Sequence, residues 1–137
     1  MALVVSFMAS SASGQGILFG VSGPENALYS INTETGAATL IGGTGVTPPP
    51  GTSGPPTALA SDPLTGAVWA MFNGSNTLYS LNLGTGTATE FLTLNLDSLE
   101  LTATSLLNVG LTYDPAQTLF YVSDLDSDSL YSFGLDG

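Results

Sequence analysis

The middle of the chain shows short runs of apolar and β-branched residues separated by turn-forming residues. Four such runs follow one another at about Thr57–Ser61, Ala67–Phe72, Thr77–Asn82 and Thr87–Leu94. Val, Thr, Phe, Trp and Tyr favour the pleated, packed surface of a strand. No long stretch places its apolar residues at helical spacing. The pattern therefore predicts four consecutive β-strands.

The segments between these runs carry the residues that tight turns require. Pro presets φ in the turn that begins at Asp62-Pro63. Asn and Gly tolerate positive φ, so the Asn73–Asn76 segment predicts a hairpin, and Gly84–Gly86 predicts a further turn. The Leu96–Leu107 segment contains several leucines, but its Ser, Thr and Asp content favours a loop. We therefore expect no α-helix longer than about two turns.

This strand and turn pattern occurs three times. Tyr29, Tyr79 and Tyr131 each follow a Leu and precede a Ser, and they are 50 and then 52 residues apart. Regular internal similarity of this length indicates a repeat architecture. The other landmarks that keep the same offsets are Phe19, Trp69 and Tyr121; Thr35-Gly36 and Thr85-Gly86; Ala38-Thr39 and Ala88-Thr89; and Asp62-Pro63 and Asp114-Pro115.

The third strand of each unit is apolar on both faces. Side chains alternate between the two faces of a strand, so Tyr79 and Leu81 point one way and Leu78 the other. A sheet with apolar residues on both faces must be covered on both sides. Four-stranded sheets stacked around a common axis provide this, which is the arrangement of a propeller. We expect Trp69 to be buried between two adjacent sheets.

The repeat resembles the blades of secreted bacterial β-propeller-like repeat proteins. The resemblance rests on the Leu-Tyr-Ser strand, the following Thr-Gly and Ala-Thr pairs, and the Asp-Pro turn before an aromatic strand, and it covers roughly residues 16–137. It implies an all-β fold of propeller-like blades in an exported protein. It indicates little about function, because propellers serve many functions.

The repeat boundaries predict an incomplete ring of about three four-stranded units. The units lie at about residues 1–45, 57–95 and 109–137, with a Pro-rich linker at 47–56. Aligning the last unit with the middle one ends the third unit before its fourth strand, so a neighbouring chain could complete the ring. We expect residues 17–137 to form one β-repeat domain.

Residues 1–16 allow two interpretations, a remnant of a secretory signal or an apolar structural strand. As a strand, this segment could pair within its own chain or complete the sheet of a neighbour. The assembly residues predicted on this basis are Ala2, Leu3, Val4, Val5, Phe7 and Met8, together with the exposed strand at Tyr131 and Phe133.

The composition excludes several functions. The chain has no Lys, Arg, His or Cys and a net charge of −11. Binding to nucleic acid needs basic groups to neutralise phosphate, so we expect no nucleic-acid partner. Zinc, copper and iron sites normally need His or Cys. No apolar run reaches the length of a membrane span.

The same composition leaves little for catalysis. Only carboxylates such as Asp62, Glu90 and Asp114 could act as acids or bases, and two of these belong to repeated turns. No His or Lys is present to activate a serine. We therefore predict that the protein is not an enzyme, although a carboxylate glycosidase is conceivable.

Two binding or modification sites are weaker candidates. Asp124, Asp126 and Asp128 alternate along one segment and could bring oxygen atoms together on calcium, although the alternative is a solvated turn. No other cofactor is expected. Asn73-Gly74-Ser75 matches an N-glycosylation sequon, which is a short and common pattern.

Taken together, these features predict a structural subunit of an extracellular or cell-surface assembly, such as a filament. The protein would be its own partner, and subunits would join by strand pairing. The alternative is a fragment of a secreted propeller that binds a ligand such as a carbohydrate.

Overall fold

The computed structural model of the protein describes residues 3–6, 17–46, 56–95, 106, 109–125 and 127–135. These residues form strands, turns and short connections, and no helix occurs among them. The prediction of an all-β chain is therefore confirmed for the described part. Most of Leu96–Leu107, predicted to be a loop, lies outside the described residues. No described segment could cross a membrane as a helix.

The strands form three antiparallel sheets, each of which follows the order of the chain. The first sheet contains β1 (Leu3–Ser6), β2 (Ile17–Ser22), β3 (Ala27–Asn32) and β4 (Ala38–Gly43). The second contains β5 (Pro56–Ser61), β6 (Val68–Phe72), β7 (Thr77–Leu81) and β8 (Ala88–Thr93). The third contains β9 (Gly110–Asp114), β10 (Leu119–Asp124) and β11 (Ser129–Gly134).

The sequence repeat is also a repeat of strand register. Phe19 lies opposite Ser30, Trp69 opposite Ser80 and Tyr121 opposite Ser132. The four strands predicted in the middle unit agree with β5 to β8 to within one residue at each end. The turn residues and the alternation of apolar residues were therefore sufficient to place these strands.

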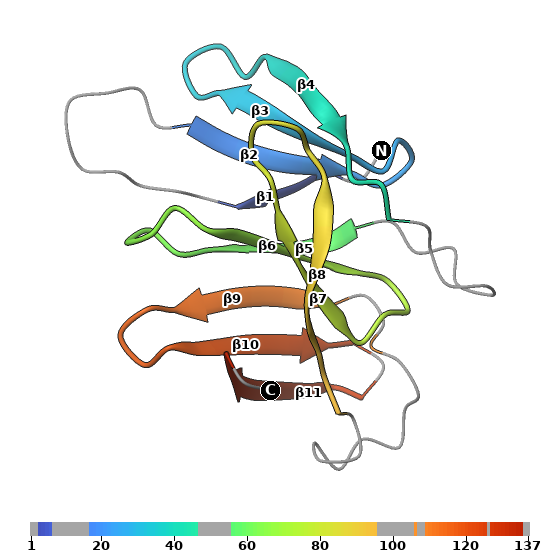
Figure 1. Cartoon of the computed structure of the whole chain (residues 1–137), viewed down its shortest axis with the longest axis vertical. Helices are drawn as coiled ribbons and strands as arrows, with labels where there is room; N and C mark the ends of the chain where they lie inside the picture. Colours follow the sequence, from blue (N-terminus) through green and yellow to red (C-terminus); the bar gives the residue numbers. More distant parts are fainter. Residues whose placement is uncertain are drawn as a thin grey trace.

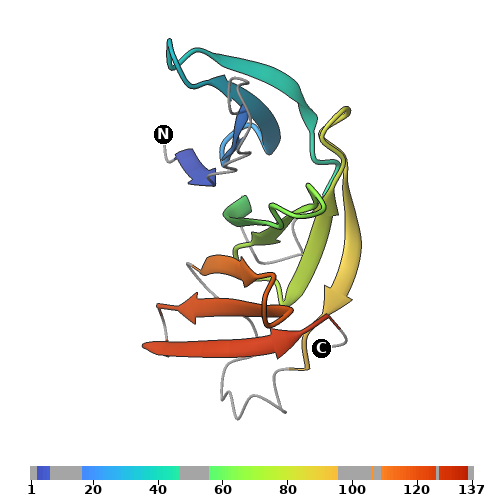
Figure 2. The same ribbon diagram turned by 90° about the vertical axis from the view of Figure 1, so that its left-hand side faces the viewer.

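The second sheet lies between the other two (Figures 1 and 2). Its first strand, β5, contacts β1 and β2 of the first sheet and β9 of the third. The first strands of the three sheets are thus neighbours, as the inner strands of propeller blades are.

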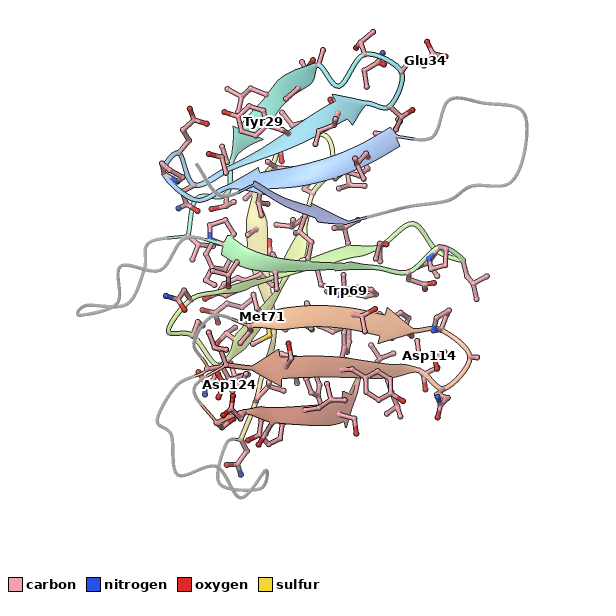
Figure 3. All side chains as sticks on the ribbon, turned by 180° about the vertical axis from the view of Figure 1, so that it is seen from behind. Tyr29, Glu34, Trp69, Met71, Asp114 and Asp124 are labelled. Carbon is pink, nitrogen blue, oxygen red and sulfur yellow. The ribbon has the colours of Figure 1, made fainter. Side chains whose placement is uncertain are left out.

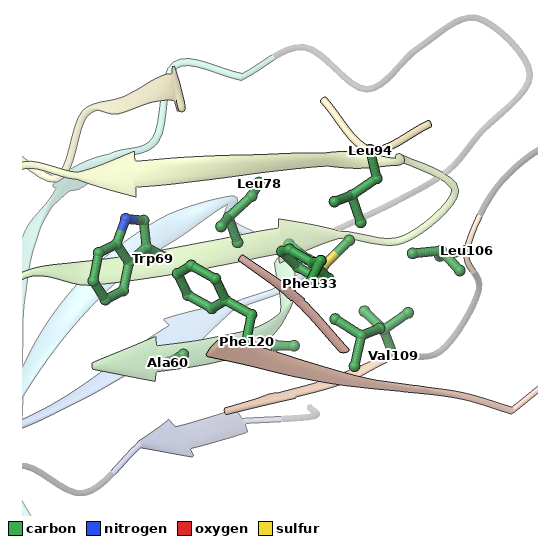
Figure 4. Close-up of a cluster of buried hydrophobic side chains, with 11 residues drawn as sticks. Ala60, Trp69, Leu78, Leu94, Leu106, Val109, Phe120 and Phe133 are labelled. Atoms are coloured by element: carbon green, nitrogen blue, oxygen red, sulfur yellow. The ribbon is translucent and has the colours of Figure 1, made fainter. Parts of the chain in front are cut away.

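Apolar cores fill the two spaces between the three sheets. The core between the second and third sheets is shown in Figure 4, and its largest side chains are Trp69, Met71, Leu78, Leu94, Leu106, Phe120 and Phe133. The core between the first and second sheets contains Phe19, Val21, Leu28, Val68, Phe72, Tyr79 and Leu81. The prediction that β7 is covered on both faces is confirmed, because Leu78 enters one core and Tyr79 and Leu81 the other.

Trp69 is buried between adjacent sheets, as predicted, with 6% of its surface exposed. Its ring meets the ring of Phe120 edge-on at a centroid distance of 5.0 Å, and that of Tyr113 at 5.1 Å. Such tilted and edge-on pairs are the favoured arrangement of aromatic rings.

The outer strands of the first two sheets are joined by a close backbone contact. A Cβ atom added at Gly42 in β4 would lie 2.1 Å from the carbonyl oxygen of Thr85, which precedes β8. Beside it, the backbone N–H of Ala88 donates to the carbonyl oxygen of Thr44 at 2.8 Å. Only glycine at position 42 allows the two backbones to approach this closely.

Candidate functional site

The third sheet ends in an open edge among the described residues. The first and second sheets are completed by β4 and β8, whereas β11 pairs only with β10. We use the term open edge for the side of β11, Ser129–Gly134, that faces away from β10. Unpaired N–H and C=O groups on such an edge can pair with another strand.

The two side chains predicted for assembly on β11 point into the molecule. Phe133 is buried in the core against Phe120, with ring centroids 5.3 Å apart. The hydroxyl of Tyr131, which is half-buried, donates to the Oγ of Ser127 at 3.0 Å. An assembly role of Tyr131 and Phe133 therefore falls to their backbone groups, while their side chains hold β11 in place.

The N-terminal segment forms a strand in its own chain. Leu3, Val4 and Val5 belong to β1, which pairs antiparallel with β2 from Leu3–Ser22 to Ser6–Phe19. β1 is the edge strand of the first sheet, and β11 lies at the far side of the third (Figure 1). The structure thus does not bring the two predicted assembly segments together within one chain. Ala2, Phe7 and Met8 lie outside the described residues.

The third sheet also has an exposed apolar face, which we call its outer face: Leu119, Tyr121 and Leu130, on the side opposite the core. Leu130 is 69% exposed, whereas its counterpart Leu78 in the second sheet is fully buried. Tyr121 is half-buried, whereas its counterpart Trp69 is buried. The repeat thus places core residues on a face that no described sheet covers.

The first sheet has a matching outer face on the opposite side of the molecule. Tyr29 and Leu40 are cross-strand partners there, and Leu40 is 58% exposed. Ile31 on the same face is buried, so the open part of this face lies at Leu40 and at Tyr29, which is labelled in Figure 3. The counterpart of Tyr29 in the second sheet is Tyr79, which is buried in the core.

Sequence analysis did not identify these two outer faces. The signal was available, because Tyr121 and Leu130 occupy the repeat positions of Trp69 and Leu78. A residue type that is required in the core of one unit and recurs in the last unit indicates a surface that another sheet can cover.

Tyr29 makes a polar contact on the outer face of the first sheet. Its hydroxyl donates a hydrogen bond to the carboxylate of Glu25. This bond and partial desolvation raise the pKa of Tyr29 above its usual value of 10.0. The phenol therefore stays neutral at physiological pH.

The acidic segment at the end of β10 is a turn beside a shallow, open pocket. Asp124 is buried, and its carboxylate accepts the backbone N–H of Ser127 at 3.1 Å. Asp128 is exposed with a φ of 50°, and Asp126 lies outside the described residues. No group of three metal-binding side chains occurs among the residues that are described. Calcium binding stays a prediction.

The pocket has a volume of about 390 Å³ and lies between the acidic turn and the outer face of the third sheet. Ser123 and Leu130 form its outer-face side, and Asp124, Leu125, Asp128 and Ser129 form the rest. Its polar groups are hydroxyls and carboxylates, which suit a hydroxylated ligand or a hard cation.

Asp128 occupies the repeat position of two asparagines that hold the outer strand of a sheet. The side-chain N–H of Asn26 donates to the carbonyl oxygen of Val46 at 2.7 Å, and that of Asn76 donates to Leu94 at 3.0 Å. A carboxylate at position 128 cannot make such a donation. The third sheet therefore lacks the group that fixes the end of a fourth strand in the other two.

The carboxylates of Asp62 and Asp114 stabilise turns, as their repeated Asp-Pro context predicted. Asp62 accepts the hydroxyl of Thr65 at 2.7 Å and the backbone N–H of Leu64 at 2.9 Å. Asp114 accepts the side-chain N–H of Gln117 at 2.7 Å, at the end of the third sheet opposite Asp124 (Figure 3). These hydrogen bonds hold the pKa of both carboxyls below the usual 3.8.

Asn73 lies in the turn between β6 and β7 and is half-buried. Ser75 of the same sequon is buried, and its Oγ accepts the backbone N–H of Thr77 at 3.1 Å. The sequon serine thus has a structural role in the turn. Glycosylation of Asn73 stays a prediction.

The described residues form an all-β fold of three small antiparallel sheets, which is consistent with propeller-like blades, and the solved structures that resemble it include the following two. One is a protein of unknown function from Bacteroides thetaiotaomicron VPI-5482, with a TM-score of 0.67 and 25% identity over 88% of this chain and 29% of that one. The other is a chain of a nidogen/laminin complex, with a TM-score of 0.60 and 12% identity over 95% of this chain and 46% of that one.

These likenesses support the propeller-like interpretation of the repeats. The chain spans less than half the length of either structure. No protein-family model and no curated protein sequence matches it.

Proposed function

We propose that this protein is a non-catalytic structural subunit of an extracellular assembly, and that subunits join by strand pairing at the open edge of β11. The observation that carries the proposal is the missing fourth strand of the third sheet among the described residues. A backbone edge of this length gains hydrogen bonds when another strand pairs with it.

In this proposal, β1 of a neighbouring copy is the strand that pairs with β11. β1 is itself an edge strand, so its free side can pair with β11 of the neighbour while its other side keeps β2. The contact links two different surfaces, and such contacts generate filaments when they do not close. A filament is therefore the expected form of the assembly.

Two single substitutions in β11 test the proposal. Alternate N–H groups of an edge strand point toward the neighbouring strand and toward solvent, so Ser129→Pro and Ser132→Pro remove one of each kind. One variant should lose a bond within the sheet and unfold more easily. The other should keep the stability of the parent chain and lose long particles in negative-stain electron microscopy.

Long particles from both variants, at parental length and abundance, would exclude pairing at β11. Deleting residues 1–9 removes the proposed donor strand and should give monomers. Because β1 also belongs to the first sheet, circular dichroism must show that the shortened chain keeps its strands.

The pocket beside the acidic turn favours a second candidate function, the binding of a hydroxylated ligand such as a carbohydrate. Its volume falls in the range of small-molecule sites, and Tyr121 lies on the adjoining face. Screening the chain against a glycan array tests this candidate, with Asp128→Ala as the variant that should lose binding. Exposed Glu90, which lies away from the pocket, supplies the control Glu90→Ala.

A further inference from the structure

One contact between sheets is made twice within this chain with the same repeat positions. Phe19, Val21 and Leu28 of the first sheet pack against the second sheet. Their counterparts Trp69, Met71 and Leu78 pack against the third. The receiving positions also correspond, because Val68 and Leu81 of the second sheet match Phe120 and Phe133 of the third.

The outer face at each end of the stack carries one of the two surfaces that form this contact. The outer face of the third sheet has the donating positions, where Tyr121 and Leu130 replace Trp69 and Leu78. The outer face of the first sheet has the receiving positions, where Tyr29 replaces Tyr79. The two halves are on opposite sides of the same molecule (Figures 1 and 3).

We infer that the outer face of the third sheet binds the outer face of the first sheet of a second copy of this chain. A second copy is the expected partner, since this pair of surfaces repeats a contact that the protein already makes twice. The sheets described in two copies number six, within the four to eight of closed propellers. The inference goes beyond the proposed strand pairing at β11, because it assigns a separate contact between the faces of two copies.

Apolar burial must provide the affinity of this contact. Each copy has a net charge of −11 and no basic side chain, so no ion pair between side chains can form across the interface. Leu130, which is 69% exposed, and Tyr29, which is half-buried, both keep accessible apolar surface in the single chain. Covering such side chains is the dominant favourable contribution to association.

Single charge substitutions on the two faces test the inference. Leu130→Glu and Tyr29→Glu each place a charge in the contact, and each should weaken pairing more than about tenfold in sedimentation equilibrium. Leu130 is exposed and Tyr29 is half-buried, and circular dichroism must show that both single chains keep their strands. Leu64→Glu is the control, because Leu64 is 78% exposed in the turn after β5 and lies on neither face.

Mixing the two variants provides the decisive measurement. In a closed pair of identical variant chains, both contacts contain one altered face. In a mixed pair, one contact has both altered faces and the other has none. Mixing Leu130→Glu with Tyr29→Glu chains should therefore restore a species of twice 13.9 kDa that neither variant forms alone. Failure of the mixture to pair, or pairing of Leu130→Glu alone at parental strength, would overturn the inference.

The outcomes for the two proposals are separable. If the face variants form long particles like the parent chain, the face contact is wrong and strand pairing at β11 stands. If the faces pair normally and no proline variant affects assembly, the proposed strand pairing is wrong. A parent chain that stays monomeric at every concentration excludes both.

Discussion

At the scale of single residues, one aromatic position occurs in two environments. Phe19 and Trp69 fill the spaces between sheets, whereas Tyr121 at the same position lies half-exposed on the outer face of the third sheet. The repeat preserves the residue class while the location of the sheet determines its burial. The contribution of each residue to stability should therefore follow its location.

We expect Trp69→Ala to lower the free energy of unfolding by about 3–5 kcal/mol, because it leaves a cavity beside Phe120 and Tyr113. Tyr121→Ala should cost much less, because its ring is only partly covered. Urea unfolding followed by circular dichroism measures both values. Equal losses for the two variants would show that Tyr121 is covered in solution.

A second residue-scale prediction concerns the backbone contact between the first two sheets. Gly42→Ala places a methyl group 2.1 Å from the Thr85 carbonyl oxygen, so the outer strands must separate. We expect a loss of about 1–3 kcal/mol in unfolding free energy. Gly43→Ala is the matched control, since its methyl group would lie 3.9 Å from the nearest atom, and it should change stability little.

At the scale of elements, the strands were predictable because their signals are local. The turn at Asp62-Pro63 and the alternation of Leu78, Tyr79 and Leu81 depend on neighbouring residues only. The partner of β1 was not predictable, because strand pairing joins residues that are distant in sequence. Sequence analysis allowed β1 both its own chain and a neighbour, and the structure pairs it with β2.

The candidate site was predictable only in part for the same reason. Alignment of the last unit with the middle one made β11 a candidate edge, and among the described residues β11 pairs only with β10. The exposure of Leu130, whose counterpart Leu78 is buried, depends on which sheets stack against which, and no local pattern contains that information.

The Asp-Pro turns give the elements a dependence on pH. The pKa of Asp62 is lower in the folded chain than the usual 3.8, chiefly through the hydroxyl of Thr65. The unfolded chain therefore binds protons first as the pH falls. The stability from this turn is complete above about pH 3.8 and is lost as the pH falls through the lower folded value.

Asp62→Asn keeps an acceptor for the backbone of the turn and removes the titration. We expect this variant to lose less stability than the parent chain between pH 5 and pH 2, in thermal unfolding at a series of pH values. Asp114→Asn should act in the same direction, because its pKa is also lowered. An acid dependence identical to that of the parent would contradict the role of these carboxylates.

At the scale of the whole molecule, charge opposes association. Copies with a net charge of −11 repel each other, and this repulsion falls as salt screens it. We expect the affinity between copies to rise with NaCl from 0.05 to 0.5 M, measured by sedimentation equilibrium. An assembly that dissociates as salt is added would instead depend on electrostatic attraction.

The placement of the second sheet also determines how the molecule comes apart. Both faces of this sheet are buried, while the first and third sheets each have one covered face. In stacked repeats each unit is stabilised only by its neighbours, so the terminal units open first. Amide hydrogens of β6 and β7 should therefore exchange with solvent more slowly than those of β3 and β11. Loss of native structure would proceed from the two ends toward Met71 and Leu78, which are fully buried at the centre of the stack.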